Sequence, residues 1–399
     1  LRFASIFGID RPIMAELYDP VVEAMGDAYP EIKKNPDFIR KALRIEDETF
    51  LRTRDRGMKM LNEMVERAKD RGDNVIPGNE AFKLWDTYGF PYDLTIELAE
   101  DEGLRVDREG FDEAMQRQKE EARKSWKGEK LDFEVELLDE LHEIHGASEF
   151  LGYHGTGPVS SEVLGFIHHN SISNVMQEGE EGMIVLRETP FYAEAGGQVG
   201  DTGTISVNGS CFNVEDTQQT PHGIYVHKGH MQKGQIKAGE IVEAKVDEDR
   251  REKIRRNHSS VHLLQNALKR LVGDHITQAG SYVGPDYSRF DFTHTESLSR
   301  DQLEEVQREV NRLVLEDTPV ETEVLPLEEA KKKGAIAVFG EKYGAVVRVI
   351  SMAGGQSVEF CGGTHVDRTG QIAHYRITAE SSIASGVRRI EAVTGRVAA

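Results

Sequence analysis

The sequence is poor in cysteine and in long apolar stretches. Among 399 residues there are only two cysteines, Cys211 and Cys361, so a network of disulfides cannot hold the fold together. No apolar run approaches the roughly 18 residues that a membrane-spanning helix requires. These absences predict a cytoplasmic protein that folds around a buried apolar core and has no membrane partner.

Positive charge is also scarce. The 49 lysines and arginines are outnumbered by 70 aspartates and glutamates, which gives a formal net charge of -21. Proteins that bind nucleic acid through their overall charge are usually basic, so this balance excludes that mode, and we expect no DNA partner. The exceptions are a basic run at 250–256 and the pair Arg388 and Arg389, which are either solvated charges or a local approach for an anionic substrate.

Two short motifs stand out against this background. His258 and His262 are four residues apart, and so are Cys361 and His365. Residues four apart lie on one face of a helix, so the histidine pair can contact one ion from one side. A single such pair is often no more than two surface histidines, but together the motifs supply one thiolate and three imidazoles, ligand types that suit zinc. We therefore predict one zinc ion per chain.

The residues between these four refine the prediction. Ser259 follows the first histidine, where zinc peptidases have a glutamate that acts as general base, so the sequence does not favour peptide hydrolysis. Gly362 and Gly363 follow Cys361. We interpret them as positions with backbone angles that other residues avoid, in a tight loop that wraps a cation.

The periodicity of apolar residues divides the chain into three segments. Residues 1–130 have helical spacing and end in a highly charged helix at 107–127, which predicts an all-α domain with a connector. Residues 131–248 contain short apolar stretches between glycine-rich turns, which is typical of a small antiparallel β-barrel. Residues 249–399 mix both periods, and we predict an α+β domain in which helices cover one face of a sheet.

Several longer motifs resemble one known family. They are His258-Ser-Ser-Val-His-Leu-Leu264, Gln278-Ala-Gly-Ser281, Arg289-Phe-Asp-Phe-Thr-His294, Cys361-Gly-Gly-Thr-His365 and Arg388-Arg-Ile-Glu-Ala-Val-Thr-Gly395. Together they resemble the editing domain of bacterial-type alanyl-tRNA synthetases. Residues 191–198 are similar to the glycine motif that precedes that domain, and residues 25–30 and 86–91 are similar to the family's helical tRNA-recognition domain.

The resemblance implies hydrolysis of the ester in tRNA(Ala) that has been mischarged with serine or glycine. The chain begins at Leu1 rather than at a methionine, and it resembles the middle of a full synthetase, so we expect an internal fragment. The resemblance implies that the domain that uses ATP to join alanine to tRNA lies upstream, and that dimer contacts come from a domain downstream. We therefore expect tRNA(Ala) as the partner, and no charging of tRNA by this chain alone.

The resemblance also implies roles for individual residues. His258, His262, Cys361 and His365 correspond to the zinc ligands, and Gln278, Cys361 and His262 are the catalytic candidates. Candidates for contact with substrate or tRNA are Asp93, Asp86, Ser259, Arg388, Arg389, Gly196 and Gly197.

Each of these interpretations has a structural alternative. The zinc either activates water, orients the aminoacyl group, or is purely structural in a non-catalytic tRNA-binding fragment. Gln278 either holds a water or the substrate carbonyl, or is a buried amide satisfied by backbone. Ser259 either meets the serine hydroxyl of the substrate or faces solvent. Arg388 and Arg389 bind phosphate or pair internally with Glu391, and the glycine pair approaches a ligand or forms a bulged turn.

Overall fold

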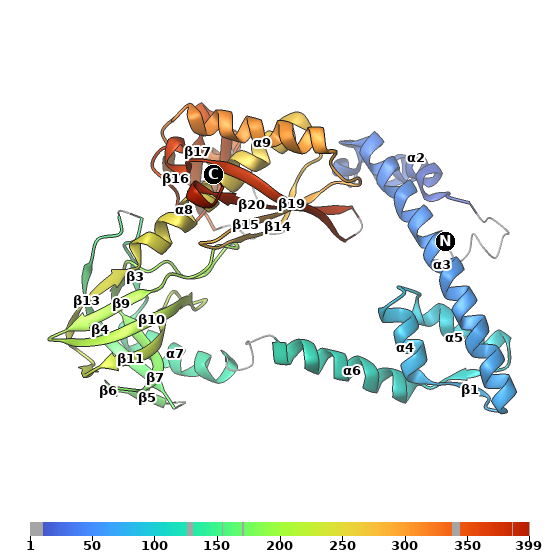
Figure 1. Ribbon diagram of the computed structural model, residues 1–399, viewed down its shortest axis with the longest axis horizontal. Helices are drawn as coiled ribbons and strands as arrows, with labels where there is room; N and C mark the ends of the chain where they lie inside the picture. The colour runs from blue at the N-terminus through green and yellow to red at the C-terminus, as the bar shows by residue number, and fades with distance from the viewer. Residues whose placement is uncertain are drawn as a thin grey trace. The chain divides into compact units, whose positions relative to one another are not determined.

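A computed structural model of the chain describes residues 11–125, 131–153, 155–169, 171–336, 344–384 and 386–398. The chain divides into two compact units, Leu1–Lys130 and Leu131–Ala399 (Figure 1). Residues 1–10 and 126–130 of the predicted helical segment lie outside the described residues. Within the described part, no helix has the length and apolar character needed to cross a membrane.

The first unit is built almost entirely from helices. Its elements are α2 (Met14–Met25), η1 (Pro30–Lys33), α3 (Pro36–Arg71), β1 (Val75–Ile76), α4 (Gly78–Asp86), α5 (Tyr92–Asp101), β2 (Arg105–Val106) and α6 (Arg108–Ser125). The parallel pair β1–β2 departs from the all-α prediction. α3 ends at Gly72, whose φ of 70° allows its N–H to reach the carbonyls of Ala68 and Lys69. Buried residues of α3 at 61, 64, 65 and 68 form the helical stripe on which this unit's core is built.

The second unit begins with a helix and a β-barrel. The elements are α7 (Leu131–His145), β3 (Glu149–Phe150), β4 (Val159–His168), β5 (Ser171–Ser173), β6 (Val175–Gln177), β7 (Glu181–Leu186), β8 (Glu188–Thr189), β9 (Gly203–Val207), β10 (Ser210–Gln219), β11 (Tyr225–Lys233), β12 (Gln235–Lys237) and β13 (Ile241–Val246). Strands pair in the order β13-β9-β10-β11-β7-β4, and β13 also pairs with β4. The ladder therefore closes into a six-stranded barrel, as predicted, with an interior that includes Phe166, Ile205 and Phe212.

The rest of the second unit contains two further sheets. Its elements are α8 (Glu248–Leu271), β14 (Gln278–Val283), β15 (Ser288–Thr293), α9 (Arg300–Leu315), β16 (Glu321–Pro326), α10 (Leu327–Lys332), β17 (Val346–Met352), η3 (Ala353–Gly355), β18 (Ser357–Phe360), η4 (Thr369–Ile372), β19 (Tyr375–Ala384), β20 (Val387–Thr394) and η5 (Gly395–Val397). One antiparallel sheet has the order β14-β15-β20-β19, and the other has the order β16-β17-β18. The predicted sheet is the four-stranded one, and the three-stranded sheet is an addition to the predicted layout.

The helices α8 and α9 pack on the same side of the four-stranded sheet (Figure 1). The core between them contains Leu264 and Leu268 of α8, Val310 of α9, and Phe290 and Ile390 of the sheet. Asp247 caps α8 by accepting a hydrogen bond from the N–H of Arg250, which fixes where this helix begins. The barrel and this region lie in one compact unit, so the predicted boundary at 248/249 stays a prediction.

Candidate metal centre

The two short motifs meet in space. One ligand atom from each of His258, His262, Cys361 and His365 lies within 4.8 Å of the others. The sulfur of Cys361 is 3.5 Å from Nε2 of His258 and 3.3 Å from Nε2 of His365. Nε2 of His262 is buried and has no hydrogen-bond partner among the described residues. A buried nitrogen without a hydrogen-bond partner, beside a thiol and two imidazoles, fits a cation-binding site.

Two different elements supply the ligands. α8 carries His258 and His262 one turn apart, and their rings stack with centroids 5.3 Å apart. The loop after β18 carries Cys361 and His365. The three histidines are buried, and Cys361 is partly exposed as a residue.

Each imidazole is held through its other nitrogen. Nδ1 of His258 donates to the amide oxygen of Gln198 at 2.7 Å, and Nδ1 of His262 donates to the carboxylate of Glu359 at 2.7 Å. Nδ1 of His365 lies 3.3 Å from the hydroxyl oxygen of Ser259. All three contacts fix the ring orientation. The amide and carboxylate oxygens only accept, so they place the ring proton of His258 and His262 on Nδ1 and turn Nε2 towards the cluster, which is the usual outer arrangement of metal-binding histidines.

Burial and close contact shift the acidity of these groups. Burial would raise the pKa of Cys361, but the three surrounding imidazoles lower it well below its ordinary value. Burial lowers the pKa of His365 well below its ordinary value. Burial alone would also lower the pKa of His262, yet the charges of Glu359 and Cys361 raise it to about 10. A thiolate among imidazoles is a donor set that zinc prefers over magnesium or calcium.

The glycines of the second motif act through space rather than through backbone angles. Neither Gly362 nor Gly363 has a positive φ, so our interpretation of them as special backbone positions is wrong. A Cβ on Gly363 would lie 2.1 Å from Cε1 of His258 and 2.9 Å from Oε1 of Gln198. Gly363 is therefore required because the loop passes directly against the first histidine.

The loop is also braced by two side chains from outside the motifs. Nη1 of Arg348 donates to the carbonyls of Cys361 and Gly363, at 2.9 and 2.8 Å. The hydroxyl of Tyr153 donates to the carbonyl of Gly362 at 2.5 Å, and the guanidinium of Arg348 lies 4.2 Å from the centre of the Tyr153 ring. Three successive carbonyls are thus held in place, which orients the Cys361 side chain.

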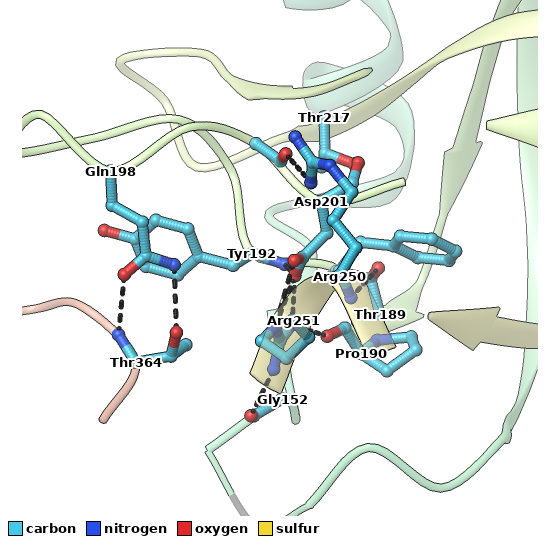
Figure 2. A network of polar contacts seen from close by, with 12 residues as sticks. Gly152, Thr189, Pro190, Tyr192, Gln198, Asp201, Thr217, Arg250, Arg251 and Thr364 are labelled. Atoms are coloured by element: carbon cyan, nitrogen blue, oxygen red, sulfur yellow. Dashed lines mark hydrogen bonds and ion pairs between the residues drawn. The ribbon is translucent and has the colours of Figure 1, made fainter. Parts of the chain in front are cut away.

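A buried ion pair joins the start of α8 to residues 190–203, the glycine-rich segment of the barrel region. Arg251 and Asp201 are both almost fully buried, and Nε of Arg251 lies 2.8 Å from the Asp201 carboxylate. The guanidinium also donates to the carbonyls of Gly152 and Pro190, and the carboxylate accepts from the N–H of Tyr192 (Figure 2). Because every charge in the pair is hydrogen-bonded, the segment is anchored to the helix that carries His258 and His262.

Other predicted residues lie close to the cluster but have structural partners. Ser259 is fully buried, so the alternative that it faces solvent is wrong, and its hydroxyl oxygen accepts from the N–H of Val366 at 3.1 Å. Gln278 begins β14, and its amide donates to Ser281 at 3.2 Å. Gly196 and Gly197 have φ of 58° and 84°. Their carbonyls accept from the hydroxyl of Ser281 and from the N–H of Val283, so this turn lies against β14.

The arginine pair after the second motif is engaged within the chain. Arg388 forms a two-bond ion pair with Glu380, and Arg389 forms one with Asp291. The internal alternative named the wrong partner, Glu391, because the carboxylates that bind these arginines come from the neighbouring strands: Asp291 of β15 lies directly opposite Arg389, and Glu380 is on β19. In the other unit, Asp86 is exposed and accepts a hydrogen bond from Gln118 at 2.6 Å, while Asp93 is exposed in the first turn of α5.

Sequence reasoning missed the residues that orient the ligands. Gln198 was within a recognised motif, but only its glycines were singled out. Glu359 lies two residues before Cys361, and a carboxylate so near a ligand motif is a signal that was present. Arg348 and Tyr153 carry no such signal, because their positions relative to the loop follow from the fold alone.

Two family models match the chain. The chain belongs to the class II (A) tRNA synthetase family, whose model matches residues 1–250. The model of the threonyl and alanyl tRNA synthetase second additional domain matches residues 347–391, which include Cys361 and His365.

Similar curated proteins are named as alanine–tRNA ligases. The chain is 43% identical over 399 residues to an alanine–tRNA ligase of Lysinibacillus sphaericus, covering 100% of the chain and 43% of that protein. It is 44% identical over 405 residues to an alanine–tRNA ligase of Thermus thermophilus, covering 100% of the chain and 46% of that protein. It is 42% identical over 396 residues to that of Bacillus subtilis, covering 99% and 45%. The chain thus spans about half the length of the curated relatives it matches.

Proposed function

We propose that this chain is a zinc-dependent editing module that hydrolyses the ester of tRNA(Ala) carrying serine or glycine. One observation carries the proposal, namely that three imidazole Nε2 atoms and one thiolate converge while each Nδ1 is held by a side-chain oxygen. When bound, zinc would act there as a Lewis acid towards water or the ester carbonyl.

The chain's own residues define the approach to this centre. Cys361 is the least buried of the four ligands, so the aminoacyl ester approaches on its side. A polar cleft of about 250 Å³ adjoins His365 and is lined by Tyr153, Thr156, Arg255 and Arg348, among others. The hydrogen bonds of Arg348 to Cys361 and Gly363 go to backbone carbonyls, which leave its positive charge unneutralised, so we assign this cleft to the anionic 3′ end of the tRNA.

Editing has a physical reason in a synthetase for alanine. A pocket that fits alanine cannot exclude glycine, which is smaller, and it rejects serine only weakly, because a single added hydroxyl changes binding by a few kcal/mol. A second hydrolytic site supplies the missing discrimination. The match to alanine–tRNA ligases over the whole chain supports this substrate class.

The helical unit supports a role in tRNA recognition. Asp93 and Asp86 are exposed carboxylates, and a carboxylate accepts a hydrogen bond from an exocyclic amine of a base while repelling phosphate. We propose Asp93 as the reader of the acceptor stem, with Asp86 beside it. For a full-length parent we propose ATP-dependent ligation of alanine to tRNA(Ala). We place the protein in the cytoplasm with tRNA(Ala) as partner.

The second candidate is a non-catalytic tRNA-binding piece with a structural zinc. It is favoured by the number of ligands, because four protein ligands normally mark a closed structural site. The two candidates differ in their response to metal removal. A structural site loses its fold with the metal, whereas a catalytic site loses turnover first.

The test is deacylation of tRNA(Ala) that carries serine, against the same tRNA carrying alanine. The native chain should release serine rapidly and alanine slowly, and metal-depleted protein with an intact circular dichroism spectrum should release neither above the buffer rate. Restored activity on adding one equivalent of zinc completes the expected result. A native chain that binds zinc but leaves the seryl ester intact would instead support the structural candidate.

A further inference from the structure

Gln198 is a fully buried polar side chain in the glycine-rich segment that precedes the metal centre. Its amide nitrogen donates to the hydroxyl of Thr364 at 2.9 Å, and its amide oxygen accepts from the backbone N–H of Thr364 at 2.9 Å (Figure 2). The same oxygen accepts from Nδ1 of His258 at 2.7 Å. One side chain thus contacts both halves of the ligand set, because His258 is on α8 and Thr364 lies between Cys361 and His365.

These contacts determine the protonation of the first ligand. An amide oxygen only accepts hydrogen bonds, so Nδ1 of His258 must carry the ring proton. Nε2 of His258 is then left with its electron pair, and it points to the sulfur of Cys361 at 3.5 Å. Gln198 therefore selects the tautomer that a metal requires.

The surrounding glycines bring Gln198 to this position. Gly197 has a φ of 84°, and a Cβ there would lie 2.5 Å from the hydroxyl oxygen of Ser281. The turn is closed by reciprocal backbone hydrogen bonds between Ala195 and Gln198. The amide of Gln198 lies between α8 and the loop that carries Gly363. A Cβ on Gly363 would lie 2.9 Å from the amide oxygen, so the glycine leaves space for this side chain.

We propose that Gln198 is a positioning residue of the metal centre, which makes the glycine-rich segment of the barrel region part of that centre. The proposal rests on the proposed function, in that it assumes zinc at the four ligands. Gln198 touches neither metal nor substrate. It acts by orienting His258 and by holding the loop of Cys361 and His365 against α8.

Three substitutions separate this role from simple packing. Gln198→Leu keeps much of the volume and removes every hydrogen bond. Gln198→Asn keeps the amide but shortens its reach by one carbon. Gln198→Glu keeps two oxygen acceptors, and the Thr364 hydroxyl can turn to donate to one of them, so this variant should restore the native arrangement. Gln218→Leu is the matched control, because Gln218 is a barrel glutamine that contacts Glu194 and Asp216 and none of the ligands.

The readouts are zinc affinity, from competition with a chelating dye, and the absorption spectrum of the cobalt(II)-substituted chain. Gln198→Leu and Gln198→Asn should weaken zinc binding about 10- to 100-fold, as loss of an outer-shell partner does. Their thiolate-to-cobalt and ligand-field bands should shift. Gln198→Glu should bind zinc nearly as tightly as the native chain, and Gln218→Leu should match the native chain in both readouts.

The outcomes distinguish the inference from the function on which it rests. Native affinity and a native cobalt spectrum in Gln198→Asn would overturn the positioning role while leaving the zinc centre in place. Failure of Gln198→Glu to restore affinity would overturn it too. A native chain that binds no zinc would overturn the proposed function itself. If Gln198→Leu does not fold, the Asn and Glu variants still decide the matter, because both retain a polar group at the site.

Discussion

The barrel and the region that carries the metal motifs each bury histidine, and they use it differently. In the barrel, both ring nitrogens of His227 have partners, the carbonyl of Ile184 at 2.9 Å and the hydroxyl of Thr189 at 2.7 Å. In the metal region, His262 has Glu359 on one nitrogen, and its other nitrogen has no partner among the described residues. Burial is nearly the same for both residues.

The difference shows which observation marks a functional site. A satisfied buried histidine completes a hydrogen-bond network and gains nothing from an added ligand. A buried histidine with one hydrogen-bonded nitrogen and one unpartnered nitrogen, close to other metal-binding groups, is placed to bind a cation. Convergence of unpaired atoms is therefore the informative feature, and burial or residue type alone is not.

The difference between the two histidines is tested most strongly by removing one from each region. His262→Ala removes a ligand, and we expect zinc affinity to fall by more than about 100-fold, because the ligand itself should matter more than its outer-shell partner. Deacylation of seryl-tRNA(Ala) should fall with it. His227→Gln should leave both unchanged per folded molecule. Zinc affinity is measured by dye competition. An equal loss of affinity in the two variants would show that the two buried histidines do not differ in function.

The next largest effect concerns the ion pair that links the two regions. Arg251→Met leaves the buried carboxylate of Asp201 without its partner, and we expect the free energy of unfolding to fall by about 3–5 kcal/mol in urea titrations. Lys253→Met is the control, because it removes an exposed pair with Asp249 on the same helix and should cause no measurable change. Similar losses in both variants would show that burial of the pair is not decisive.

The buried barrel histidine should also make stability depend on pH in the acid range. Burial lowers the pKa of His227 from 6.5 to about 4, so between these values the unfolded chain binds a proton that the folded chain does not. The contribution of neutral His227 to the free energy of unfolding is fully present above pH 6.5, and it is lost as the pH falls from there through about 4. We expect His227→Gln to flatten the decline of stability with acid over this range. Urea midpoints from pH 8 to pH 4 measure it, and parallel curves for the two proteins would contradict it.

The smallest expected effect separates two neighbouring serines of α8. Ser259→Ala removes the oxygen that holds Nδ1 of His365, and zinc affinity should fall about tenfold. The hydroxyl of Ser260 donates to the carbonyl of Asn257 at 2.8 Å, away from the four metal-binding side chains, so Ser260→Ala should leave the affinity unchanged. Both variants should lose about 1 kcal/mol of stability at most. An unchanged affinity in Ser259→Ala would show that His365 does not need this partner.

The cluster of four side chains was predictable because their spacing encodes their geometry. His258 and His262 are one helical turn apart, and the cysteine motif shares their donor chemistry, so convergence could be inferred before any fold was known. The barrel strands were predictable for a similar reason, since short apolar stretches between glycine turns have few other solutions.

The supporting residues could not be predicted in the same way. Arg348 and Tyr153 meet at the loop only because β17 and the segment after β3 are brought there by the fold. The separation of β16-β17-β18 from the larger sheet also escaped prediction, because the period of a strand does not reveal which sheet it joins. For Ser259 the sequence left contact with substrate and exposure to solvent as alternatives, because a small hydroxyl residue beside a ligand motif has the same sequence signature whether it points outward or inward. Its burial excludes the second, and the first stays a prediction.

The central claim is that His258, His262, Cys361 and His365 together bind one zinc ion, and X-ray absorption at the zinc edge tests it most directly. For the zinc-loaded chain we predict a first shell of three nitrogens at about 2.0 Å and one sulfur at about 2.3 Å. Cys361→Ser should remove the sulfur scatterer and nothing else. A first shell made of oxygen and nitrogen alone in the native chain, or the absence of stoichiometric zinc, would contradict the account.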